Sequence, residues 1–299
     1  MNAIAPSLTG NPADLGLFGA VFAVFLLAGV ALDVALFVRV RQASPLLFWL
    51  RLDAIRARPW KTVDAFSVFL LFLALNLCMS LTLSAIRRFI GLPAGRLDHV
   101  ILVLQMLGVP LAAVAVAVSV MRRRNWSWRD AFGLHAHRWP QQVLRGVVYY
   151  VAAIPVVLAA SLAYLGALVR IGYPVESQDV IRLLADPSQP LWLQIYIALL
   201  AVTLAPFAEE LLFRGIILPG LLKHASPWRA MVLASLLFAL LHLHVPSVVP
   251  LFMLAMAFSL AYVESGSLLV PMVMHAIFNG VSLGALVALR DILPLTAAP

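Results

Sequence analysis

Three charged residues interrupt an apolar stretch in the segment APFAEELLFRG, which runs from Ala205 to Gly215. They are Glu209, Glu210 and Arg214. A charge at mid-bilayer depth costs roughly 2.5 to 3.5 kcal/mol on insertion scales, so charges inside a span need partners and mark candidate functional sites. Arg214 follows Glu210 by four residues, which predicts an intrahelical ion pair. Glu209 then has no partner on its own helix.

Two later apolar stretches each carry a pair of residues four positions apart: Phe238 with His242, and His275 with Asn279. At a helical rise of 1.5 Å, Glu209 and His242 lie about 20 Å, and His275 about 12 Å, from one side of the membrane. Similar depths let the three side chains converge on one polar cavity. A single intramembrane histidine can simply pack against a neighbouring helix, but two of them near an unpaired carboxylate favour a site.

The remaining polar residues carry no motif. His244 faces nearly opposite to His242 on a helix, so we assign His242 to the site. The other histidines lie in predicted loops or interfaces and are expected to be solvated: His99, His135, His137 and His224. Three polar residues within predicted spans are expected to serve helix packing or to reach the interface: Asp33, Asn76 and Gln105.

The composition is that of a membrane protein. Of 299 residues, 63% are hydrophobic and 11% charged, with a mean hydropathy of +1.00, whereas soluble domains are about a quarter charged. The lone cysteine, Cys78, excludes a disulfide within one chain and is expected to pack between helices. The net charge of +8 suits anionic lipid headgroups. No basic face with interleaved aromatic residues is present, which argues against nucleic-acid binding.

A helix of about 20 apolar residues crosses the hydrocarbon core. By that measure the chain is an all-α, polytopic bundle of about eight transmembrane spans, and Pro206 is expected to break the long fifth span. We divide the chain into residues 1–189, four spans of unassigned role, and residues 190–299, a helical core of four spans that carries the charged residues and histidines described above. The spans are Leu15 to Val38, Val63 to Ile86, Val100 to Met121, Val143 to Val169, Pro190 to Leu222, Arg229 to Val245, Ser247 to Val263 and Ser267 to Leu289.

Three motifs in order carry a family resemblance: EELLFR with Glu209, Glu210 and Arg214; FALLH with Phe238 and His242; and HAIFN with His275 and Asn279. Together they resemble the type II CAAX prenyl protease and bacteriocin-processing (CPBP, or ABI) family of intramembrane proteases. The resemblance covers about residues 195–289. It implies a multi-pass protein of a bacterial plasma membrane that cleaves a membrane-associated protein or peptide.

The resemblance also implies roles. Glu209 with His242 would activate water, and His275 with Asn279 would stabilise the oxyanion, while Glu210, Arg214 and Phe238 support them. A competing hypothesis is a zinc site made by Glu209, His242 and His275, because two histidines and a carboxylate form a known catalytic set. No H-E-x-x-H motif occurs, so the ligands would come from three separate helices. The residues leave both mechanisms open, and no cofactor other than Zn²⁺ is indicated.

Two other function classes are compatible with intramembrane charges. A proton-coupled transporter would carry polar residues in both halves of the bilayer and repeated broken helices, which the sequence lacks. A catalytically silent scaffold, such as a bacteriocin immunity or maturation partner, would not need the set of Glu209, His242, His275 and Asn279. The protease is therefore the favoured hypothesis.

Loop charges predict the orientation. Counting alternate loops, thirteen lysines and arginines follow the odd-numbered spans and five follow the even-numbered ones, which places the odd-numbered loops in the cytoplasm and both termini outside. Single cysteines at Arg51 and Ser177, in a Cys78→Ser background, test this. We expect an impermeant thiol reagent added outside to label position 177 and spare position 51. The reverse pattern would invert the topology.

Overall fold

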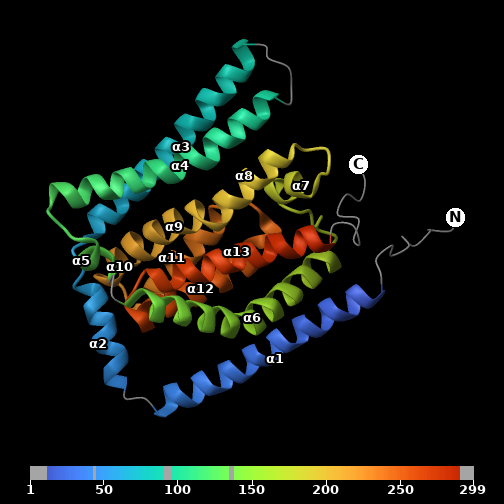
Figure 1. Cartoon of the computed structure of the whole chain (residues 1–299). Helices are drawn as coiled ribbons and strands as arrows, with labels where there is room; N and C mark the ends of the chain where they lie inside the picture. The colour runs from blue at the N-terminus through green and yellow to red at the C-terminus, as the bar shows by residue number, and fades with distance from the viewer. Residues whose placement is uncertain (1–11, 43–44, 91–95, 135–137, 290–299) are drawn as a thin grey trace.

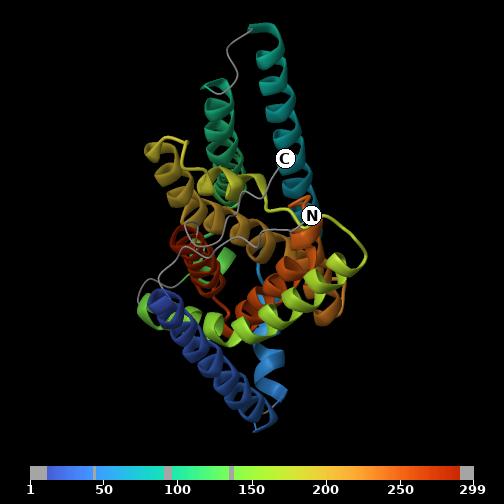
Figure 2. The ribbon, with the colours of Figure 1, turned by 90° about the vertical axis from the view of Figure 1, so that its right-hand side faces the viewer.

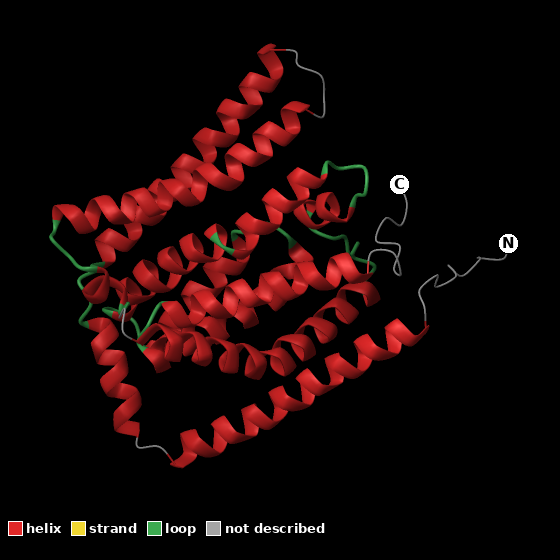
Figure 3. Ribbon diagram, viewed as in Figure 1, coloured by secondary structure: helices red, strands yellow, loops and turns green. Residues whose placement is uncertain are grey.

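The computed structural model describes residues 12–42, 45–90, 96–134 and 138–289. The chain is 85% helical, and no strand occurs in these ranges (Figure 3). Six helices are long and apolar enough to cross a membrane, and two shorter apolar helices, Gly19–Ala35 and Pro227–Leu240, accompany them. The predicted all-α transmembrane bundle is confirmed, and about eight spans agree with these helices.

Seven helices precede the segment that carries the motifs. They are α1 (Pro12–Gln42), α2 (Pro45–Arg56), α3 (Thr62–Ile90), α4 (Arg96–Arg123), α5 (Trp128–Phe132), α6 (Trp139–Arg170) and α7 (Asp179–Ala185). The remainder forms α8 (Leu191–Val202), α9 (Leu204–Glu210), the π-helix η2 (Leu211–Ile217), α10 (Leu218–Leu222), α11 (Pro227–Leu240), the 3₁₀ turn η3 (Val245–Ser247), α12 (Val248–Ser265) and α13 (Leu269–Leu289).

Helix α12 packs against α6, α11 and α13 in the centre of the bundle. Helix α1 covers α6 on one side, and the α3–α4 hairpin packs on η2 and α9 on the other. Figures 1 and 2 show the two outer pairs, α1–α2 and α3–α4, on opposite sides of this centre. The three motif-bearing segments α9–η2, α11 and α13, together with α12, therefore lie between the outer N-terminal helices.

Many large apolar side chains remain exposed, as expected where helices face lipid tails rather than water. They include Phe25, Leu70 and Leu199. Cys78 on α3 is also exposed, so the expectation that it packs between helices is wrong. Its side chain belongs to the lipid-facing surface of the α3–α4 hairpin.

The helix of the sixth predicted span is shorter in the structure than predicted. Helix α11 stops at Leu240, five residues before the predicted end, and is 14 residues long. The chain turns at Leu241 and His242, Leu243 has a positive φ of 49°, and the 3₁₀ turn η3 begins at Val245. The last turn of this segment therefore leaves the helix next to the predicted site.

One end of the bundle is tied together by the segment 57–61 and α5. The Arg58 guanidinium donates to the carbonyls of Ala131, at 3.4 Å, and Gly266, at 2.5 Å. The buried Trp60 indole N–H donates to the same Ala131 carbonyl, at 3.2 Å. These bonds link the chain before α3, the α5 turn and the α12–α13 connection, so they fix the ends of the helices that carry the site.

Candidate active site

A break in the fifth span places the two glutamates. Helix α8 ends at Val202, and Thr203 has φ −116° and ψ −75° before α9 begins. Pro206 has no N–H to donate to the Val202 carbonyl, and its ring crowds that carbonyl. The predicted break is therefore confirmed, and it lies one turn before the proline. Glu209 and Glu210 end the short helix that follows it.

The Asn279 side chain binds the backbone at this break. Its amide nitrogen donates to the Ala201 carbonyl at 2.7 Å. The last carbonyls of a helix lack partners within the helix, so this bond satisfies one of them and fixes α13 to the end of α8. The sequence did not predict this contact for Asn279. The break after α8 indicates that a carbonyl there needs a donor, but it does not indicate which side chain supplies that donor.

Glu210 and Arg214 form the predicted ion pair. The Arg214 Nη1 lies 2.7 Å from Glu210 Oε1, and both side chains are 0% exposed. Arg214 Nη2 also donates to the Ala255 carbonyl at 3.0 Å, and its guanidinium lies over the rings of Phe238 and Phe258, at 4.8 and 5.2 Å. A buried guanidinium is tolerated when it is paired in this way.

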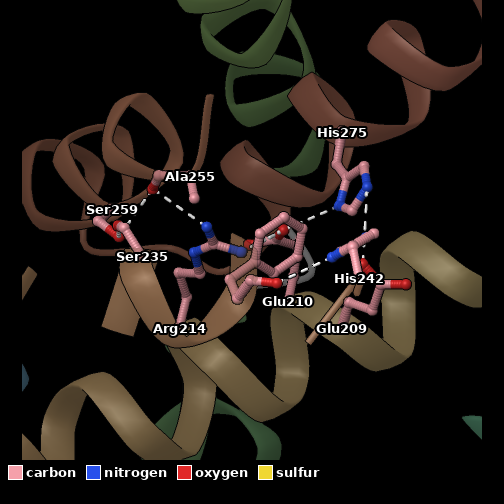
Figure 4. Close-up of polar contacts among 9 residues, drawn as sticks. Glu209, Glu210, Arg214, Ser235, His242, Ala255, Ser259 and His275 are labelled. Atoms are coloured by element: carbon pink, nitrogen blue, oxygen red, sulfur yellow. Dashed lines mark hydrogen bonds and ion pairs between the residues drawn. The ribbon is translucent and has the colours of Figure 1, made fainter. Parts of the chain in front are cut away.

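Glu210 has a second partner that the sequence did not predict. The same Oε1 atom lies 2.9 Å from His275 Nδ1. Because an ionised carboxylate only accepts, His275 carries a proton on Nδ1. The other ring nitrogen, Nε2, then faces Glu209 Oε2 at 3.8 Å. Glu210 therefore joins Arg214 to His275 and sets which nitrogen of His275 is presented to Glu209 (Figure 4).

His242 lies just beyond the end of α11. Its Nδ1 is 2.8 Å from the Phe238 carbonyl, which can only accept, so Nδ1 donates and Nε2 is left with a lone pair. The Phe238 ring contacts both histidine rings, with centroids 4.8 Å from His242 and 5.9 Å from His275. Figure 4 draws His242 and His275 on the same side of Glu210, close to Glu209.

The structure brings the motif residues of three separate helices to one place. Residues 190–281 also match the family model described as type II CAAX prenyl endopeptidase Rce1-like. This segment is CAAX prenyl endopeptidase-like. The family resemblance that the three motifs indicate is confirmed. All seven predicted site residues fall within the matched range. No curated protein and no solved structure matches the chain.

The two carboxylates of this Rce1-like segment differ in environment. Glu210 is fully buried and paired, whereas the Glu209 side chain is 33% exposed. Glu209 Oε2 is itself buried and has no hydrogen-bond partner among the described residues. A partly accessible carboxylate with an unpartnered oxygen, next to a histidine nitrogen, can bind a water molecule and accept its proton.

The zinc hypothesis finds only part of its ligand set. Glu209 Oε2 and His275 Nε2 face one another, but no group of three His, Cys, Asp or Glu side chains in the described ranges is arranged to hold a metal ion. The Nδ1 bonds of His242 to the Phe238 carbonyl and of His275 to Glu210 leave both Nε2 atoms free, as in metal-bound histidines. The ligand set fails because three such side chains do not converge in the described ranges, so the residues as placed do not fit a three-ligand zinc site and we derive no step through a metal.

The residues that the sequence assigned to solvent or packing are placed as follows where the structure describes them. His224 is exposed, and Asp33 and Asn76 are half-buried on α1 and α3. His244 contacts the backbone of Glu176 in the segment before α7. His135 and His137, and the side chains of His99 and Gln105, lie outside the described residues.

We expect Glu210→Gln to destabilise the protein by about 3 to 5 kcal/mol, because it leaves the buried Arg214 without a counter-charge. The double variant Glu210→Gln with Arg214→Met, which removes both charges, should recover much of that loss. Thermal unfolding in detergent measures both. A double variant as unstable as the single one would show that the ion pair is not the source of the effect.

Proposed function

We propose that the protein is an intramembrane endopeptidase of the plasma membrane, which hydrolyses a peptide bond in a membrane-associated protein or peptide near the cytoplasmic face. The observation that carries this proposal is the distance of 3.8 Å between Glu209 Oε2 and His275 Nε2. The other nitrogen of His275 contacts Glu210, which is paired with Arg214. Peptide hydrolysis needs a base for water and donors for the developing oxyanion. Both kinds of group are close together here.

Glu209 and His242 supply the base. The carboxylate accepts a proton from water, and the resulting hydroxide oxygen attacks the scissile carbonyl carbon. The Nε2 lone pair of His242, left free by the bond from Nδ1 to Phe238, accepts a hydrogen bond from the same water. As the C–N bond breaks, the proton held by Glu209 passes to the leaving amine, so the enzyme returns to its starting state.

His275 and Asn279 supply the donors. Nδ1 of His275 already donates its hydrogen to Glu210. A hydrogen bond from His275 to an oxyanion must therefore come from Nε2, and because both ring nitrogens then carry a proton, this requires the imidazolium form. The two carboxylates of Glu209 and Glu210, the Arg214 guanidinium and a His275 imidazolium would sum to zero charge, so this form leaves the cluster of four side chains neutral. Asn279 has two amide hydrogens and uses one for the Ala201 carbonyl, which leaves one for substrate.

Glu209→Gln tests the assignment of the base. An amide cannot take the proton of water. We therefore expect kcat/KM of the purified protein for a membrane-tethered peptide to fall by an amount that corresponds to a loss of several kcal/mol in transition-state stabilisation, with an unchanged unfolding temperature. Glu264→Gln, on the exposed end of α12, is the matched control and should cleave normally. Wild-type turnover in Glu209→Gln would remove Glu209 from the mechanism, and a wild type that cleaves no peptide would favour a silent scaffold.

Asn279→Ala separates the two mechanisms. If Asn279 donates to the oxyanion, turnover should fall about 100 to 1,000-fold with no change in bound metal. If zinc is the catalyst, the loss should be nearer 10 to 100-fold, and His275→Asn should lose metal and activity together. Metal analysis of the purified wild type beside these rates decides. We expect sub-stoichiometric zinc and the larger effect; one tightly held zinc per chain would refute this.

A further inference from the structure

The residue that follows His242 has a strained backbone. Leu243 has a φ of 49°, in the left-handed region where the Cβ of a leucine crowds the backbone. In the described ranges the only other non-glycine residue with a positive φ is Asn125, and asparagine tolerates this conformation. The Leu243 side chain is 91% exposed, so side-chain packing does not hold it. Such strain persists where the surroundings enforce it and gathers at functional sites.

The Leu243 N–H donates to the Leu240 carbonyl at 3.1 Å, so Leu243 ends α11 in a left-handed turn of the kind that usually carries glycine or asparagine. The residues that follow it are held by a directed chain of hydrogen bonds. His244 Nε2 donates to the Glu176 carbonyl at 3.0 Å, and the Ser247 hydroxyl donates to His244 Nδ1 at 2.7 Å. Gln178 Nε2 donates to the Ser247 oxygen at 3.0 Å. The direction follows because a carbonyl only accepts. We call His244, Ser247, Glu176 and Gln178 the His244 anchor.

A further bond holds the same segment from α6, where the Tyr164 hydroxyl donates to the Val245 carbonyl at 3.0 Å. Tyr164, Glu176 and Gln178 all precede residue 190, so they lie outside the segment that matches the family. The anchor therefore fastens the chain after α11 to the chain between α6 and α7.

His242 and His244 are thus held by different partners on either side of Leu243. His242 binds the Phe238 carbonyl of its own helix, and His244 binds the Glu176 carbonyl of a distant segment. The backbone of Leu243 alone connects these two fixed points. If it relaxed to an ordinary conformation while the anchor stayed in place, the His242 ring would have to turn away from Phe238 and Glu209.

We propose that the His244 anchor holds Leu243 in the left-handed conformation and thereby positions His242 for the reaction. This inference rests on the proposed protease function. Leu243 and the members of the anchor are positioning residues, since none of them touches Glu209 or His275. In this proposal the connection between α6 and α7, which lies outside the Rce1-like segment, positions a catalytic histidine within that segment.

The competing role for Leu243 is lipid contact, because an exposed leucine on a membrane protein can simply face the bilayer. The two roles rank substitutions in opposite orders. If conformation matters, asparagine is tolerated and valine is harmful, since asparagine adopts a positive φ readily and a β-branched residue does not. If lipid contact matters, valine is tolerated and asparagine is harmful. Leu243→Asn and Leu243→Val are therefore a matched pair.

Turnover of the tethered peptide is the first measurement. We expect Leu243→Val and His244→Ala each to lower kcat on the order of 10 to 100-fold with little change in KM, as a displaced catalytic group does. Leu243→Asn should keep normal turnover, and adding it to His244→Ala should restore most of the lost kcat. Tolerated valine with harmful asparagine, no effect of His244→Ala, or no rescue would each overturn the proposal.

The second measurement does not depend on cleavage. A His242→Cys substitution in the Cys78→Ser background reports, by its rate of reaction with a thiol reagent, how position 242 is presented. We expect His244→Ala to change this rate several-fold and Leu243→Asn to return it toward the starting value. If the wild type cleaves nothing, the protease assignment fails while this rate still decides the positioning role; an unchanged rate in His244→Ala overturns it.

Discussion

The burial of a single guanidinium constrains the whole site. Arg214 is fully enclosed by Phe238, Phe258 and the backbone of α12, and a charge in such surroundings must be neutralised locally. Glu210 supplies the counter-charge and is held in place by it. Because Glu210 also accepts from His275, the need to neutralise Arg214 fixes a histidine on another helix. The electrostatics of burial thus determine where the reactive nitrogen points.

The helix break serves a complementary purpose. A continuous helix would leave no carbonyl of α8 free for a side chain, whereas the break at Thr203 leaves the Ala201 carbonyl for Asn279. Helix α13 therefore contacts the broken span at two places one turn apart, through His275 and through Asn279. Two such contacts limit both sliding and rotation of one helix against the other, which a site that needs sub-ångström placement requires.

The sequence predicted the fold well because membrane spans obey a strong length rule. Backbone groups must be satisfied inside the hydrocarbon, so long apolar runs become helices. The six long helices and the two shorter apolar helices of the described residues agree with the eight predicted spans. The turn after Leu240 was missed, since neither glycine nor proline stands at Leu240, Leu241 or His242 to mark where the helix stops. The short helices α2 and α5 were also missed, because short helices have no comparable length rule, whereas α7 lies in the loop between Arg170 and Pro190 where an interfacial element was expected.

The contacts between the candidate site residues could be predicted from the sequence only within one helix. The spacing of Glu210 and Arg214 gives their ion pair directly, since both lie on one helix. The bond between Glu210 and His275 joins residues 65 positions apart, and no periodicity encodes a contact between separate helices. The 100-degree step from Glu210 to Glu209 suggested separate roles for them. A glutamate side chain has enough reach, however, for both carboxylates to meet the same imidazole from one helix, one at each ring nitrogen. That shared histidine makes the charge of Glu210 relevant to the chemistry of Glu209, so the two acids form one electrostatic unit although only one is exposed.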